Sequence, residues 1–147
     1  YSQMSNSVNR SLAREYAFIL LFRSLFSSES DYTSLLTAQI EDCPIVDNPY
    51  TEFLYNGVCE KSDELNNVIS EMSSRWKLDR ISKVALVVCR IAVYEMFYVS
   101  DVPVGVAISQ AISLTKKYSD ESSIAFVNGL LSAISKKYSD KFSEKKN

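Results

Sequence analysis

The stretch ISKVALVVCRIAVYEMFYVS, residues Ile81–Ser100, decides the fold that we predict. Within Val84–Val99 only Arg90 and Glu95 carry a charge, and the other side chains are aliphatic, aromatic, Met or Cys. A helix that is apolar on all sides must be surrounded by protein or by lipid. At about 1.5 Å per residue these sixteen residues would cover about 24 Å, less than the ~30 Å of a hydrocarbon core. We therefore predict a buried central helix of a globular domain over about 81–100, and no membrane span.

The composition of the whole chain also favours long helices. Its 147 residues are 46% hydrophobic and 23% charged, which is typical of one globular domain that buries a sizeable core. Only 3 Gly and 3 Pro are present, which disfavours a turn-rich β fold. We predict an all-α single domain over residues 1–147, with a flexible N-terminus over 1–9 and a Lys-rich tail over 139–147 that frays.

Apolar residues spaced three and four apart predict seven helices along the chain. They are expected over about 9–27 and 31–42, from about 49 and from about 62, then over 81–100, 103–118 and 120–138. Ser62 is expected to cap the fourth helix, Ser82 or Asp79 the fifth, and Asp120 or Ser119 the seventh. Pro103 is expected in the first turn of the sixth helix.

The sequence lacks the usual chemistry of enzymes and metal sites. It has no His, so the commonest acid–base side chain is missing, and it has no Gly-rich phosphate loop. Cys43, Cys59 and Cys89 form no C-x-x-C pair and are odd in number, which disfavours a zinc site and a disulfide framework. No signal peptide or transmembrane segment is apparent. We therefore expect no enzyme activity and no cofactor, and we expect a cytoplasmic location.

Charge is distributed unevenly along the chain, although the net charge is only -2. Residues 1–26 carry three Arg and one acid, residues 27–75 carry ten acids and two bases, and residues 136–147 carry five Lys and two acids. The chain is thus basic at both ends and acidic in its middle. If the two ends meet in space, they form a basic patch that suits an anionic partner, although basic tails are also common without such a role.

The junction between the last two predicted helices is a candidate anion site. Lys116 and Lys117 end one helix, and Ser122 and Ser123 open the next, where unpaired backbone N–H groups and the positive end of the helix dipole point outward. This combination suits a phosphate. The simpler alternative, which composition alone favours, is that Lys complements the dipole of one helix and Ser caps the next.

Other residues of the predicted helices also stand out. Phe126 falls at the flank of an apolar stripe, where it can stack on a base or join the core. Gly129 in a helix interior costs about 1 kcal/mol relative to Ala, so we expect close approach of another backbone. Arg90 and Glu95 lie about 140° apart around the central helix, and we expect structural ion pairs rather than catalysis.

The first predicted helix carries Arg10 and Arg14 one turn apart on a shared ridge. A solvated first turn is the simplest interpretation of this pair. A helix N-terminus normally favours acids, however, so two arginines there indicate some other role.

Four segments within residues 75–133 carry the most specific signal in the sequence. They are WKLDRISKV (Trp76–Val84), CRIAVYEM (Cys89–Met96), DVPVGVAISQAISLTKKYS (Asp101–Ser119) and FVNGLL (Phe126–Leu131). In order and spacing they resemble the NusB family of transcription antitermination factors. NRSLARE (Asn9–Glu15) resembles the arginine-rich start of that family, whereas the acidic middle matches only in its helical pattern.

The resemblance implies seven helices in two packed subdomains and a non-catalytic RNA-binding protein. It implies a boxA-type single-stranded RNA of ribosomal RNA operons as ligand, with the ribosomal protein NusE as co-binder in the RNA polymerase antitermination complex. Both a monomer and a homodimer are compatible with it. The RNA-binding residues that it implies are Arg10, Arg14, Phe22, Lys116, Lys117, Ser122, Ser123 and Phe126.

Some positions depart from the family pattern. Ser11 and Leu12 stand where bases are usual, Ala85 and Leu86 where an acid and a base are usual, and Ser122 where an acid is common. Fewer bases predict a weaker salt-dependent RNA affinity, and the loss of the acid puts the NusE contact in question. One alternative is a helical protein–protein interaction module of the same fold with a degraded RNA site. Another is a fragment related to the NusB-like domain of ribosomal RNA cytosine methyltransferases, although no methyl-donor domain or catalytic Cys motif is present.

Overall fold

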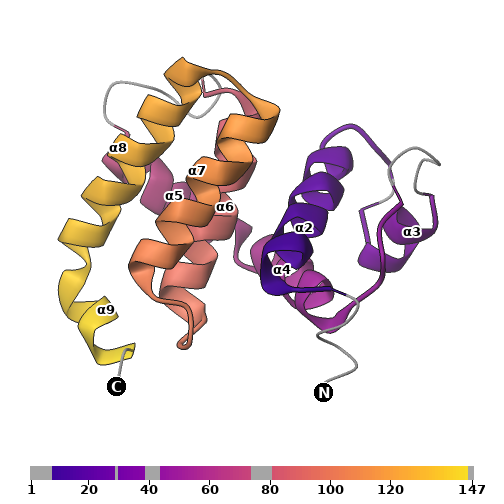
Figure 1. Ribbon diagram of the computed structural model, residues 1–147, viewed down its shortest axis with the longest axis horizontal. Helices are drawn as coiled ribbons and strands as arrows, with labels where there is room; N and C mark the ends of the chain where they lie inside the picture. Colours follow the sequence, from indigo (N-terminus) through magenta and orange to yellow (C-terminus); the bar gives the residue numbers. More distant parts are fainter. Residues whose placement is uncertain (1–7, 29, 39–43, 74–80, 146–147) are drawn as a thin grey trace. The chain divides into compact units, whose positions relative to one another are not determined.

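The computed structural model describes residues 8–28, 30–38, 44–73 and 81–145. These residues contain α-helices and no strand, which confirms the predicted all-α fold (Figure 1). The predicted residues Asp79, Trp76 and Cys43 lie outside the described ranges. The helices are α2 (Arg10–Ser24), α3 (Tyr32–Thr37), α4 (Pro49–Glu60), α5 (Ser62–Met72), α6 (Lys83–Tyr98), α7 (Val104–Tyr118), α8 (Glu121–Lys137) and α9 (Ser139–Lys145).

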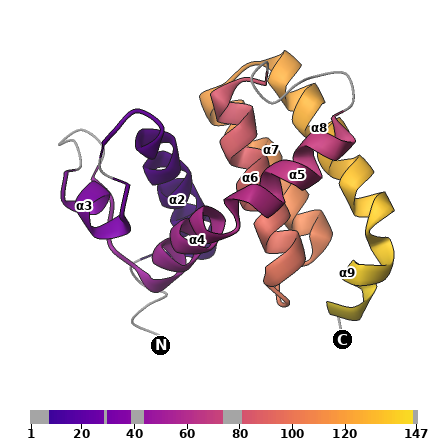
Figure 2. The same cartoon turned by 180° about the vertical axis from the view of Figure 1, so that it is seen from behind.

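The chain divides into two compact units, Tyr1–Glu60 and Lys61–Asn147. In the first unit, α2 packs against α3 and α4. In the second unit, α6 packs against α5, α7, α8 and α9, and Figures 1 and 2 show α7 on one side of it and α5 on the other. The fold therefore consists of two helical subdomains, with the predicted central helix inside the second.

Helix α6 is buried along most of its length, as its composition predicts. Its N-cap is Ser82, whose Oγ accepts a hydrogen bond from the Ala85 N–H at 3.1 Å. Glu95 is buried, and the half-buried Arg90 donates from Nε to Asn66 Oδ1 on α5 at 2.8 Å. This hydrogen bond joins two helices of the second unit, which supports a structural role for Arg90.

Two of the predicted helix starts are wrong. Ser62 is the first residue of α5, and the N-cap position is Lys61, whose side chain makes no capping hydrogen bond. Lys61 is not extended (φ -98°, ψ 18°), because α4 ends only one residue earlier, at Glu60. Pro103 is the N-cap residue of α7 rather than part of its first turn, with an extended backbone that is compatible with its fixed φ. Asp120 caps α8 as predicted.

The expected close approach of another backbone to Gly129 is also wrong. A Cβ atom at this position would meet no heavy atom of the described residues within 4 Å, and the neighbouring Asn128 is exposed as well. The opposite face of α8 buries Val127, Leu131 and Ile134. This burial offsets the cost of a glycine inside the helix.

Residues 139–145 of the Lys-rich tail form helix α9, so the expectation that this part of the tail frays is corrected. Phe142 is buried, and its ring meets the Phe97 ring edge-on with the centroids 5.3 Å apart. Lys141 Nζ lies 4.8 Å from the centroid of the same Phe97 ring. An aromatic contact with the end of α6 therefore holds this part of the tail, although its composition is mostly polar.

Candidate nucleic-acid interface

The two arginines at the start of α2 share one aromatic partner. Asn9 Oδ1 accepts the Leu12 N–H at 2.8 Å, which starts the helix at Arg10. The guanidinium carbon of the exposed Arg10 lies 4.1 Å from the centroid of the Tyr50 ring, and that of Arg14 lies 6.0 Å from it. Arg14 is only 4% exposed, so the interpretation as a solvated first turn is wrong for this residue.

The position of Tyr50 follows from a hydrogen-bonded corner at the start of α4. Asn48 Oδ1 accepts the Thr51 N–H at 2.9 Å, and Asn48 Nδ2 donates to Thr51 Oγ1 at 2.7 Å. Thr51 Oγ1 in turn donates to the Ala13 carbonyl of α2 at 3.0 Å. Sequence reasoning missed Tyr50, because its partners lie on a helix far away in the sequence and no local pattern marks the contact.

Phe22 lies further along α2 in a column of aromatic rings. The half-buried Phe22 is 5.9 Å from the Phe18 ring and 5.3 Å from the Phe26 ring, centroid to centroid, and Phe26 is 66% exposed. Eight residues separate Phe22 from Arg14, which corresponds to about 12 Å along the helix axis. Arg10 and Arg14 thus form one group with Tyr50, and Phe22 belongs to a different part of the helix.

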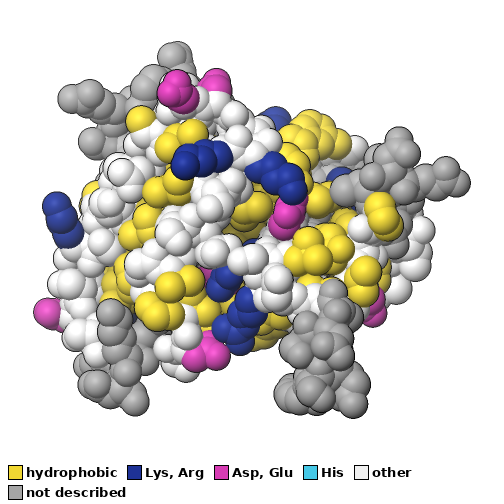
Figure 3. All heavy atoms as spheres, in the orientation of Figure 1, with side chains coloured by type: hydrophobic (Ala, Val, Ile, Leu, Met, Phe, Trp, Pro, Cys, Tyr) yellow, Lys and Arg dark blue, Asp and Glu magenta, His cyan; other side chains and the backbone are white. Residues whose placement is uncertain are grey.

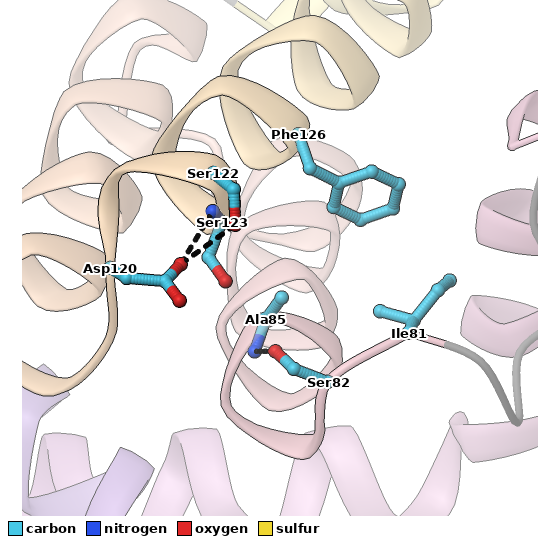
Figure 4. Close-up of a pocket in the computed structure, with 7 residues that line it drawn as sticks. All are labelled: Ile81, Ser82, Ala85, Asp120, Ser122, Ser123 and Phe126. Carbon is cyan, nitrogen blue, oxygen red and sulfur yellow. Dashed lines mark hydrogen bonds between the residues drawn. The ribbon is translucent and has the colours of Figure 1, made fainter.

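In the second unit, three of the predicted site residues line one pocket. Ser122, Ser123 and Phe126 lie on α8 and face a pocket of about 310 Å³ (Figure 4). Its apolar wall comes from Phe126 with Ile81 and Ala85, two residues that sequence reasoning did not connect with the site. The remaining lining residues are Ser82 and Asp120.

The first turn of α8 already holds a carboxylate. Asp120 Oδ1 accepts the Ser123 N–H at 3.0 Å and the Ser122 hydroxyl at 2.9 Å (Figure 4). The Ser123 N–H bond, followed by the bond from Ser122, keeps the pKa of Asp120 below its ordinary value, so the group is charged at neutral pH. The carboxylate takes the place that a phosphate would occupy at this helix end. The pocket therefore suits an uncharged planar group with an apolar face better than it suits an anion.

The two predicted lysines lie in the last turn of α7, just before this pocket in the chain. Lys116 and Lys117 are exposed, and Lys117 Nζ lies 5.8 Å from the Tyr118 ring centroid. On the face drawn in Figure 3, Lys and Arg side chains reach the surface among hydrophobic ones.

Within the described ranges, other kinds of site find little support. No group of three or more His, Cys, Asp or Glu residues there could hold a metal ion. No described helix combines the length and the apolar character that crossing a membrane requires. Cys59 is exposed, and burial raises the pKa of the Cys89 thiol to about 12, which keeps Cys89 protonated.

Comparison with known proteins identifies one family. The chain matches the family model described as NusB family over residues 11–136. It is 39% identical to transcription antitermination protein NusB of Clostridium botulinum over 133 residues, 88% of this chain and 100% of that protein. It is 39% identical to the Bacillus subtilis protein of that name over 127 residues, 86% of this chain and 95% of that protein.

Two solved structures have a similar fold. T. maritima NusB matches with a TM-score of 0.79 and 30% sequence identity, covering 92% of this chain and 98% of that chain. A structure of antitermination factors NusB and NusE in complex with double-stranded RNA contains a chain that matches with a TM-score of 0.74 and 30% identity. That match covers 88% of this chain and 97% of the other.

Proposed function

The chain belongs to the NusB family, and from this premise we propose a non-catalytic antitermination factor that binds boxA-type single-stranded RNA together with NusE. A similar solved structure holds NusB, NusE and double-stranded RNA in one complex, which supports RNA and NusE as partners. The complex would act with RNA polymerase on ribosomal RNA operons, and such work takes place in the cytoplasm.

The observation that carries the proposal is the pocket beside Phe126. An unpaired base can insert its flat face against Phe126, Ile81 and Ala85, while the hydroxyl of Ser122 reaches the edge of the base. Lys116, in the last turn of α7, would then meet a neighbouring phosphate. In this arrangement Ser122 and Ser123 contact the base and not a phosphate, since the Asp120 carboxylate already accepts hydrogen bonds at the start of α8.

The arginines of the first unit would extend the contact along the RNA. Arg10 is exposed and carries a charge that can pair with a phosphate, while Arg14 is held beside the Tyr50 ring. We propose that Arg10, Arg14 and Phe22 are the contribution of the first unit to RNA binding, and Lys116 that of the second.

Titration of a boxA-type RNA, with and without NusE and at several salt concentrations, tests the proposal. Three exposed cationic side chains are available, Arg10, Lys116 and Lys117, whereas Arg14 is buried. With about 0.7 counterions released per contact on a single strand, the slope of log K against log salt is expected to reach about -2 at most. Lys116→Ala with Lys117→Ala is expected to make this slope shallower by about 1.4. Absence of RNA binding with NusE present, or binding that ignores salt, would refute the proposal.

A helical protein–protein interaction module with a degraded RNA site is the second candidate. It is favoured by the charged carboxylate of Asp120 inside the pocket and by Ser11 and Leu12 in the first turn of α2. Capture of NusE that survives Arg10→Ala with Arg14→Ala, in the absence of any RNA binding, would support this candidate. Sizing of the protein in solution decides between monomer and homodimer for either candidate.

A further inference from the structure

We propose that Tyr50 and Phe53 of α4, together with Arg10, form a stacking platform for one unpaired base of the RNA. This base site lies in the first unit and is additional to the pocket beside Phe126 in the second unit. The inference rests on the proposed RNA binding and adds a contact to it. The platform lies wholly within Tyr1–Glu60, so it does not depend on how the two units are placed.

The geometry of the two rings suits stacking. The Tyr50 and Phe53 rings are 5.8 Å apart, centroid to centroid, and their planes differ by 28°, which makes a nearly parallel pair. The Phe53 side chain is 45% exposed although it is large and apolar. The guanidinium carbon of Arg10 lies 4.1 Å from the Tyr50 ring centroid, so a cation and the exposed Phe53 ring belong to one cluster around Tyr50. Flat bases stack on aromatic rings and on guanidinium planes, and a nearby cation also draws the phosphate of the same nucleotide.

The platform is also held in place before any ligand arrives. Thr51, which lies between Tyr50 and Phe53 in the sequence, is 0% exposed and is hydrogen-bonded to both Asn48 and the Ala13 carbonyl. This corner fixes the first turn of α4 to α2, so the backbone that carries Tyr50 and Phe53 does not have to be ordered when the RNA binds. A preorganised surface loses less conformational entropy on binding, which favours tight stacking.

The location of Phe53 separates it from an ordinary exposed apolar residue. Phe26, which is more exposed, packs against Phe22 near the C-terminal end of α2, sixteen residues from Arg10. Phe53 lies instead in the cluster with Tyr50 and both arginines. Base faces are hidden inside an RNA duplex, so this platform would select unpaired RNA.

The test uses the full chain with NusE and a boxA-type RNA that carries 2-aminopurine at one position at a time. We expect quenching at one position to depend on Phe53, and Phe53→Ala to weaken binding about 5- to 100-fold with loss of that quenching. The salt slope is expected to stay unchanged, because no charge is removed. Phe53→Trp is expected to keep both affinity and quenching. Leu25→Ala is the matched control, since Leu25 is 41% exposed near the other end of α2.

Each outcome bears on the platform in a different way. Unchanged affinity and quenching in Phe53→Ala, with the wild type binding, would overturn the platform and leave the proposed function intact. An equal loss on duplex RNA, or a loss of NusE capture without a loss of RNA affinity, would also overturn it and indicate a different contact. Failure of the wild type to bind RNA would overturn the proposed function and the platform with it.

Discussion

Replacement of Thr51 by Val tests the corner that joins α4 to α2. The change keeps the shape of the side chain and removes one hydroxyl, which accepts from Asn48 Nδ2 at 2.7 Å and donates to the Ala13 carbonyl at 3.0 Å. Because the site is fully buried, water cannot replace either partner. Asn48 Nδ2 keeps one hydrogen bond, to the Val46 carbonyl at 2.9 Å, which limits the loss of stability.

The free energy of unfolding is expected to fall by about 1–3 kcal/mol, since each lost hydrogen bond contributes about 0.5–1.5 kcal/mol. For a chain of this length, each kcal/mol lowers the melting temperature by about 2–4 °C. Urea unfolding monitored by circular dichroism measures the loss. RNA affinity is expected to fall as well, because Tyr50 loses its fixed position under Arg10 and Arg14.

Thr115→Val is the matched control for this prediction. Thr115 is equally buried, but its Oγ1 donates to the Ala111 carbonyl of its own helix at 2.8 Å, within α7. That hydrogen bond lies within one helix, so its loss does not separate α7 from another element. If Thr51→Val destabilises the protein no more than Thr115→Val does, the corner does not hold α4 on α2, and our account of the Tyr50 position fails.

Three further predictions concern the second unit. Asp120→Asn is expected to keep the cap of α8, to strengthen RNA binding by removal of a negative charge, and to flatten the acid side of the stability profile. The pKa of Asp120 is lower in the folded protein than its unfolded value near 3.8, so its contribution to stability is present above that value and is lost as the pH falls through the folded pKa. Equal acid unfolding of the variant and the wild type would contradict this. Phe142→Ala is expected to release α9 from Phe97, seen as fast amide exchange confined to residues 139–145; unchanged protection would show that the ring does not hold the helix. Glu71→Gln is expected to leave the melting temperature unchanged, although Glu71 pairs with Lys137 at 2.9 Å, because both side chains are about half exposed and the pair is screened by solvent; a clear drop would refute this.

The features that sequence reasoning found are those with local signals. Helix α6 is predictable because its apolar residues are contiguous, and the Ser82 and Asp120 caps because a capping side chain acts on a residue three positions later. The helix at Ser139–Lys145 was missed because its polar residues outnumber the apolar ones, although Phe142 follows Tyr138 at helical spacing.

The candidate site was predicted only in part, for a similar reason. Ser122, Ser123 and Phe126, which line the pocket, stand close together in the sequence, so their grouping is visible before the structure is known. The packing of Tyr50 against Arg10 joins residues forty positions apart, and it depends on a buried hydroxyl that no periodicity reveals. Contacts of this kind appear only when the helices are packed.

The two aromatic sites have a common physical consequence for how this chain would hold RNA. Asp120 places a negative charge in the pocket beside Phe126, and Ser11 and Leu12 leave the first turn of α2 with few bases, so charge supplies less of the affinity. The stacking that we propose at Phe126 and on the Tyr50–Phe53 platform would not be screened by salt and would depend on exposed base faces. A protein with this balance discriminates unpaired RNA from duplex more strongly than one that relies on phosphate contacts, because phosphates are presented by both forms and base faces by only one.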